Sequence, residues 1–197
     1  MFSVWFGKKL FRLDNVHIFN PAALGLALLT ILSMIAEDRS GSPGVIISWW
    51  GADLGQQFLA DQLYLYFALA LFFLCGFIYF ARAFKKLWYV ISFTLSYLAV
   101  GVIVISLIDG GSVAELLGVT VRSLILSAIS FMVLVMFVEP KTSPAIPKQQ
   151  IAVGLLGAML LHLLNSYGYA VPIDPLVLTV LGVNIATYIL KTRRLLQ

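Results

Sequence analysis

The sequence predicts an all-α, polytopic membrane helix bundle with about six transmembrane helices and with both termini in the cytoplasm. Of the 197 residues, 61% are hydrophobic and 11% are charged, whereas soluble domains have roughly 45–50% and about 25%. The hydrophobic residues form blocks of about 20, the length that a helix needs to cross roughly 30 Å of hydrocarbon. The blocks lack the alternation of a membrane β-barrel, and helices satisfy their own backbone hydrogen bonds in lipid.

Six hydrophobic blocks are the expected spans. They cover residues 21–36, 63–81, 87–108, 116–138, 151–165 and 171–190. Residues 1–16 have no hydrophobic core followed by an A-x-A cleavage pattern, so we interpret them as a cytoplasmic or interfacial arm. Because no domain boundary or clear repeat appears, we expect a single transmembrane domain over residues 1–197, with the bundle in residues 17–197.

The distribution of basic residues predicts the orientation. If the N-terminus is cytoplasmic, eleven of the thirteen lysines and arginines lie in cytoplasmic segments, and only Arg39 and Arg122 do not. Cytoplasmic loops are enriched in these residues, so the pattern favours six spans with both termini in the cytoplasm. The formal charge of +4 does not indicate nucleic-acid binding, because the basic residues lie beside spans and form no single patch.

The first block opens with the motif HIFNPAALG, residues 17–25. Asn20 is a good N-cap and Pro21 a good first helical residue, so starting a helix explains much of the motif. A capped helix start also presents free backbone N–H groups and a positive dipole end, which bind anions or phosphates. Both interpretations stay open.

Residues 37–62 form the longest connection and contain Trp49 and Trp50. We expect these rings to anchor the membrane interface, with ligand stacking as the alternative. The single cysteine, Cys75, lies within the second block, so the chain forms no intrachain disulfide.

Arg122 lies in the fourth block, and serines follow it at positions 123, 127 and 130. We expect Arg122 to extend to the outer headgroups, with an ion pair to Asp109 or Glu115 in an aqueous cavity as the alternative. Serines at this spacing favour a close helix–helix seam over a proton path.

The connection between the fourth and fifth blocks is VEPKTSPAIPKQQ, residues 138–150. Its three prolines prevent a continuous helix and make a stiff loop. The loop places Glu139 at the inner end of a span, where a carboxylate costs free energy unless it is paired or hydrated, so the residue is a functional candidate. The structural alternative is an ion pair with Lys141 or Lys148 at the headgroups.

Both motifs face the cytoplasm in the predicted topology, so we expect them to lie close enough to form one site. The histidines do not share such a site, because His17 and His162 fall near opposite membrane faces. Each is expected to be a polar side chain satisfied at an interface and not a metal ligand. The sequence contains no Walker loop, dinucleotide fingerprint, nucleophile elbow or zinc-protease helix, so hydrolase and ATPase activities have no support.

Together the two motifs resemble the NqrB/RnfD family, whose members are membrane subunits of the sodium-pumping NADH:quinone oxidoreductase and of the Rnf ferredoxin:NAD oxidoreductase. HIFNPAALG is similar to the family's FNPA signature. EPKTSPAIPKQQIAVG is similar to its second signature, an acidic residue and proline followed by T-S-P or T-T-P and a span that opens with small residues. The family is also similar, in the same order along the chain, at the segments WWG, CGFIYFARAFKK and GVNIATYIL. The resemblance covers nearly everything from His17 onward and is closest to variants that precede a flavin- and nicotinamide-binding reductase domain.

The resemblance implies a helical bundle with pseudo-repeated halves that works in electron transfer through flavins, in some members coupled to sodium or proton movement. Glu139 occupies the acidic position that is linked to cation uptake. The implied partners, besides the lipid bilayer, are a reductase or other membrane subunits of an electron-transfer complex. A flavin, FMN or riboflavin, is expected to bind noncovalently at the signature positions Asn20, Pro21, Thr142, Ser143 and Pro144.

The sequence departs from the family in two ways. Larger members carry Ser-Gly-Ala-Thr, whose threonine holds FMN covalently, whereas GVTV around Thr120 does not match it. We therefore expect no covalent FMN. Family bundles also have further spans before the FNPA signature, so this chain is expected to be a short or incomplete member.

Three functions follow as hypotheses. The first is a membrane subunit or module of a flavin-linked electron-transport system, at most the membrane subunit of an NADH- or ferredoxin-linked oxidoreductase. The second is a small ion or solute channel or transporter, which Arg122 and the hydroxyl-rich fourth block favour. The third is a non-catalytic structural or assembly subunit.

Overall fold

The computed structural model describes residues 12–13, 16–40, 63–108, 110–167 and 173–195. Within them, the two-residue strands β1 (Arg12–Leu13) and β2 (Val16–His17) pair antiparallel. The tryptophans Trp49 and Trp50, Asp109 and most of the N-terminal arm lie outside the described residues. The predictions for them stay predictions.

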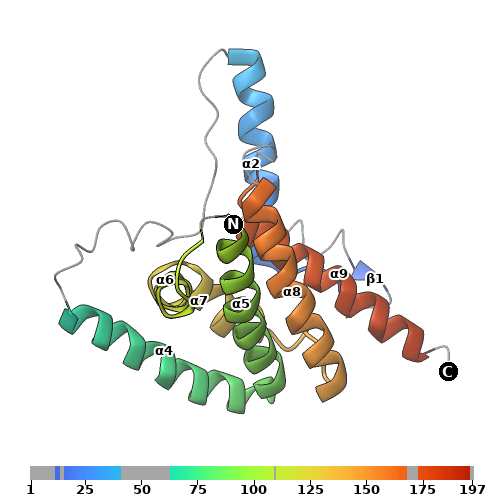
Figure 1. The fold of residues 1–197 in the computed structure, drawn as a ribbon. Coiled ribbons are helices and arrows are strands. Elements are labelled where there is room, and N and C mark those ends of the chain that lie inside the picture. Colours follow the sequence, from blue (N-terminus) through green and yellow to red (C-terminus); the bar gives the residue numbers. More distant parts are fainter. Residues whose placement is uncertain (1–11, 14–15, 41–62, 109, 168–172, 196–197) are drawn as a thin grey trace.

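The rest of the described chain is helices and their connections (Figure 1). They are α2 (Pro21–Ser40), α4 (Leu63–Ala83), α5 (Leu87–Ile108), α6 (Val113–Leu126), α7 (Ile129–Phe131), the π-helical η1 (Met132–Met136), α8 (Pro147–Tyr167) and α9 (Pro175–Leu195). This confirms the all-helical prediction, and each of the six hydrophobic blocks lies mainly in helix.

Three of the described helices contain segments long and apolar enough to cross a membrane, namely Leu87–Leu107, Pro147–Ser166 and Pro175–Thr192. A fourth span results if Val113–Ile125 and Ile129–Met136 count together. The apolar parts of α2 and α4, Pro21–Ile35 and Ala70–Ala83, are shorter. The structure thus agrees with a multi-pass membrane protein that has three or four such helices in its described part.

The fourth block differs from the single span expected over residues 116–138. Its two helical parts meet at Ser127 with a bend of 67°. The Ser127 hydroxyl accepts a hydrogen bond from the Ile129 N–H at 3.2 Å, and the Ser130 hydroxyl donates to the Ser127 carbonyl at 3.2 Å. These side chains replace bonds that a continuous helix would make through its backbone, which explains the break.

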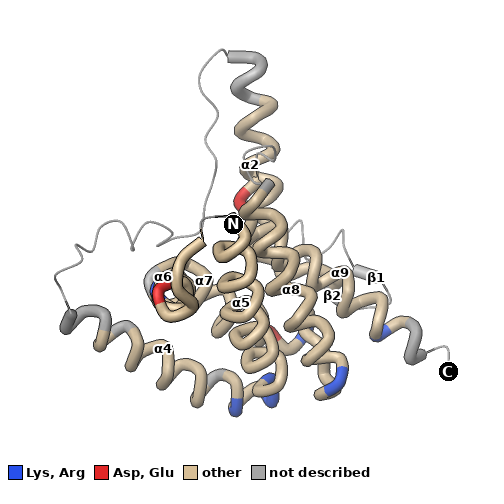
Figure 2. Tube along the Cα trace, viewed as in Figure 1, with Lys and Arg blue, Asp and Glu red and all other residues tan. Residues whose placement is uncertain are grey.

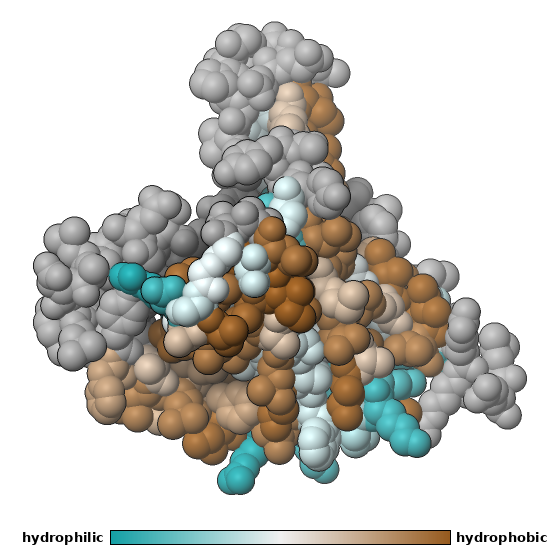
Figure 3. All heavy atoms as spheres, in the orientation of Figure 1, coloured by the Kyte–Doolittle hydropathy of each residue, from teal (hydrophilic) through white to brown (hydrophobic). Residues whose placement is uncertain are grey.

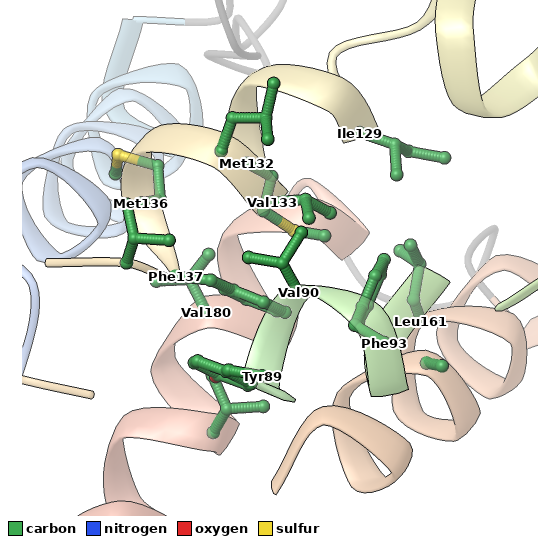
Figure 4. Close-up of a cluster of buried hydrophobic side chains, with 14 of the residues drawn as sticks. Tyr89, Val90, Phe93, Ile129, Met132, Val133, Met136, Phe137, Leu161 and Val180 are labelled. Atoms are coloured by element: carbon green, nitrogen blue, oxygen red, sulfur yellow. The ribbon is translucent and has the colours of Figure 1, made fainter. Parts of the chain in front are cut away.

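The core lies where α5, α8, α9 and η1 meet. Phe137 stacks on Tyr89, with ring centroids 5.0 Å apart, and meets Phe93 edge to face at the same separation (Figure 4). Many large apolar side chains instead face outward, among them Phe72 and Leu107, which are 73% and 81% exposed. The visible face is therefore largely hydrophobic (Figure 3), as a surface in contact with lipid should be.

Lysines and arginines gather at the end of the bundle where α4 meets α5 and α8 begins (Figure 2). We call this the basic end. The turn between α4 and α5 contributes Lys85 and Lys86, and α8 contributes Lys148 in its first turn. Glu115 follows the far end of α5, where it forms a capping box with Ser112 at the start of α6. The lysines of the basic end and Glu115 thus lie at opposite ends of α5.

Candidate functional site

The loop between η1 and α8, residues 137–146, is fixed at the basic end by side chains from other segments. The ammonium group of Lys86 donates a hydrogen bond to the Pro144 carbonyl at 2.7 Å. The Gln150 amide donates to the carbonyls of Lys85 and Ala145 at 3.0 and 3.2 Å. Because prolines supply no backbone N–H, regular secondary structure cannot pair all of the loop's carbonyls. The side-chain donors pair them instead.

Within this loop, the predicted site residues bond mainly to one another. The Thr142 hydroxyl donates to the Glu139 carboxylate at 3.2 Å, and the Ser143 hydroxyl donates to the Glu139 carbonyl at 2.6 Å. Thr142 and Ser143 are buried, as is Pro144, whereas Glu139 is half-buried. The serine and threonine therefore shape the loop, and the carboxylate at its start is held by a hydroxyl.

Asn20 caps α2, as the sequence suggested. Its side-chain oxygen accepts hydrogen bonds from the backbone N–H groups of Ala22 and Ala23 at 2.9 and 3.3 Å. Its amide nitrogen lies 3.8 Å from the Met136 sulfur, although 116 positions separate the two residues. The start of α2, where Pro21 is the first residue, thus lies beside η1, which leads into the second motif.

The two motifs meet at a narrow hollow that encloses about 150 Å³, its open mouth included. Seven residues line it: Ile18, Lys141, Thr142, Asn184, Thr187, Tyr188 and Lys191. The predicted meeting of the motifs is therefore present, although Thr142 is the one predicted cofactor-binding residue in the lining. We call this space the hollow.

Four of the lining residues come from α9 and were not among the predicted site residues. Their positions, 184, 187, 188 and 191, follow the i, i+3, i+4, i+7 pattern of one helical face. Asn184 and Thr187 are 4% and 2% exposed. The Asn184 amide nitrogen and the Thr187 hydroxyl have no hydrogen-bond partner among the described residues, which is rare for buried polar atoms.

The electrostatics of the hollow are dominated by lysines. Lys191 donates a hydrogen bond to the Lys141 carbonyl at 3.0 Å. Burial, and secondarily the positive charge of Lys191, lower the pKa of Lys86 to about 8. An ammonium group whose pKa is lowered in this way is stabilised by a nearby anion. Glu139 contributes negative charge close by, within the same loop.

Other predicted candidates lie away from the hollow. His162 lies between α8 and α5, where its Nε2 is 2.9 Å from the Tyr97 carbonyl oxygen and its ring stacks on the Tyr97 ring. This agrees with a satisfied interface side chain. Arg122 is exposed on α6, and the side chain of His17 is not described. No group of three or more His, Cys, Asp or Glu side chains suited to a metal occurs in the described part of the chain.

The hollow does not fit a flavin as it stands. Sites for molecules of that size enclose roughly 300–1,000 Å³, whereas the hollow is too narrow to admit a water molecule, and its 150 Å³ include the open space at its mouth. A ligand group therefore enters only if a side chain of the lining moves. No family model matches the chain, and no curated protein or solved structure matches it significantly.

Proposed function

We propose that the chain is an integral membrane module of a flavin-linked electron-transport system, with six spans, both termini in the cytoplasm and a location in a bacterial-type inner membrane. A flavin supplies the electron transfer, and a separate reductase or another membrane subunit supplies the electrons. The observation that carries the proposal is the hollow, because two motifs distant in sequence meet there beside buried donors that have no partner among the described residues. The chain's own residues would hold the ligand at the basic end.

The test is the visible absorbance spectrum of gently purified protein, followed by acid precipitation. We expect flavin absorbance, with the chromophore released into the supernatant because no covalent link is formed. A colourless protein that also binds no added FMN or riboflavin would contradict the proposal. Flavin that stays with the precipitate would contradict its noncovalent part.

The broken fourth block favours a second candidate, a small ion or solute transporter. Transporters place interrupted helices at their substrate sites, where freed backbone groups contact the cargo, and the break at Ser127 with the π-helical η1 is such an interruption. Solute flux into proteoliposomes without any redox partner would favour this candidate over electron transfer.

Glu139 is the proposed entry point for a coupled cation. Replacing it with glutamine keeps an acceptor for the Thr142 hydroxyl but removes the charge, so we expect Glu139→Gln to fold normally and to lose about tenfold or more in cation-dependent electron transfer with its reductase partner. The measurement is the rate as a function of sodium concentration and pH. The matched control is Glu115→Gln, because Glu115 lies in the exposed capping box of α6.

If Glu139→Gln and Glu115→Gln both leave the partner's rate unchanged, the cation role of Glu139 is wrong. A purely structural subunit, the third hypothesis, predicts this result.

A further inference from the structure

We infer that the hollow binds a phosphate group through Asn184, Thr187 and the ammonium groups of Lys141 and Lys191. The phosphate belongs either to FMN or to an anionic phospholipid. The inference concerns the site of the proposed function and rests on that function only for the first source.

The unpaired polar atoms of α9 point to a ligand. Thr179 and Thr192 on the same helix donate to the carbonyls four residues earlier, at 2.8 and 3.0 Å, which is the usual arrangement for threonine in an apolar helix. The Thr187 hydroxyl makes no such bond, and the Asn184 amide nitrogen, one turn earlier, also has no partner in the part of the chain that the structure describes. A ligand oxygen in the hollow would give both groups a partner and recover the free energy that their burial costs.

The charge around these donors selects an anion. Lys141 and Lys191 line the hollow, and Lys86 lies near enough to feel the charge of Lys191. Lysine is a common phosphate ligand that acts as a point charge. The carboxylate of Glu139 opposes an anion, but it accepts a hydrogen bond from Thr142 and is outnumbered by the ammonium groups.

The hollow is closed as it stands, and Lys191 is the side chain that has to move. The space inside does not admit a water molecule, so a phosphate enters only when the hollow opens. The Lys191 ammonium now donates to the Lys141 carbonyl, and its four-carbon stem is flexible. Ile18 and Tyr188 give the hollow an apolar wall. A phosphate would thus replace the Lys141 carbonyl as the partner of Lys191.

The experiment compares ligands that differ in their phosphate. The full chain is reconstituted in phosphatidylcholine nanodiscs, and binding of FMN and of riboflavin is measured by equilibrium dialysis. In parallel, the retention of phosphatidylglycerol after purification is measured by native mass spectrometry. The variant is the double change Asn184→Leu with Thr187→Val. The matched control is Thr179→Val, because the Thr179 hydroxyl lies on the same helix and already donates a hydrogen bond.

If FMN is the source, we expect it to bind about tenfold or more tightly than riboflavin, since a charge-assisted phosphate contact is lost in riboflavin. If a phospholipid is the source, FMN and riboflavin should bind alike or not at all, and phosphatidylglycerol should be retained. In either case the effect should disappear in the double variant and persist in Thr179→Val.

The inference is overturned if neither the FMN preference nor the lipid retention differs between the double variant and Thr179→Val. A yellow protein that neither prefers FMN nor retains phosphatidylglycerol would overturn the phosphate site and leave electron transfer standing. A colourless protein that retains phosphatidylglycerol, and loses it in the double variant, would contradict electron transfer and support the phosphate site. Folding of the double variant and of Thr187→Val alone is checked by thermal unfolding without ligand. Thr187→Val should match or exceed the wild type, because it removes a buried hydroxyl that has no partner among the described residues.

Discussion

Gly154→Leu is expected to abolish the folded bundle, and Gly154→Ala to destabilise it by about 1–3 kcal/mol, the range for overpacking a close interface. Gly154 lies where α8 meets α5. A Cβ atom there would lie 2.8 Å from the Tyr89 carbonyl oxygen and 3.0 Å from the Phe93 backbone nitrogen. Backbone atoms in a helix cannot move aside as a side chain can. Small residues allow such close approach between membrane helices, which lack a hydrophobic driving force for association.

The matched control is Gly118→Ala, because a Cβ atom at Gly118 in α6 meets no described residue within 4 Å. Alanine replaces a poor helix former there, so we expect a neutral effect or a stabilisation of up to about 1 kcal/mol. The measurements are size-exclusion chromatography and thermal unfolding in detergent. Equal unfolding temperatures for wild type, Gly154→Ala and Gly154→Leu would mean that α5 and α8 do not pack as described.

The helices could be predicted from the sequence because their cause is local. A block of about 20 apolar residues in lipid must satisfy its backbone internally, so each such block forms a helix. The break at Ser127 could not be predicted in the same way. Serine is tolerated in a continuous helix when its hydroxyl bonds to a carbonyl one turn earlier, and nothing in the sequence shows that Ser127 instead accepts from the Ile129 N–H.

The meeting of the two motifs was predicted from the sequence, but the polar atoms of α9 that line the hollow were not. The motif residues Asn20, Thr142 and Ser143 use their side chains to cap α2 and to shape the loop. The unpaired donors lie on α9, where Thr187 looks the same in sequence as Thr179. Whether a threonine bonds to its own helix depends on its rotamer and its neighbours, which are properties of the packed bundle.

Gln150→Leu is expected to release the loop that forms one side of the hollow. Gln150 is 1% exposed, and its amide donates to the carbonyls of Lys85 and Ala145. Leucine has a similar volume but no donor, so these carbonyls would lose a partner. Each lost bond should cost about 0.5–1.5 kcal/mol, because both bonds are only partly buried. Part of this loss is offset because leucine also removes the Gln150 side-chain oxygen, which is unpaired among the described residues.

We therefore expect Gln150→Leu to lower the unfolding temperature and to speed amide hydrogen exchange at residues 141–146. Both effects are measured in detergent by differential scanning fluorimetry and by exchange mass spectrometry. The control is Gln149→Leu, because Gln149 is the preceding residue of α8 and is only half-buried. If the two variants exchange alike, the prolines hold the loop without Gln150. If only Gln150→Leu exchanges faster, the hydrogen bonds of the Gln150 amide link the start of α8 to the turn between α4 and α5. The position of the loop beside the hollow then depends on these bonds.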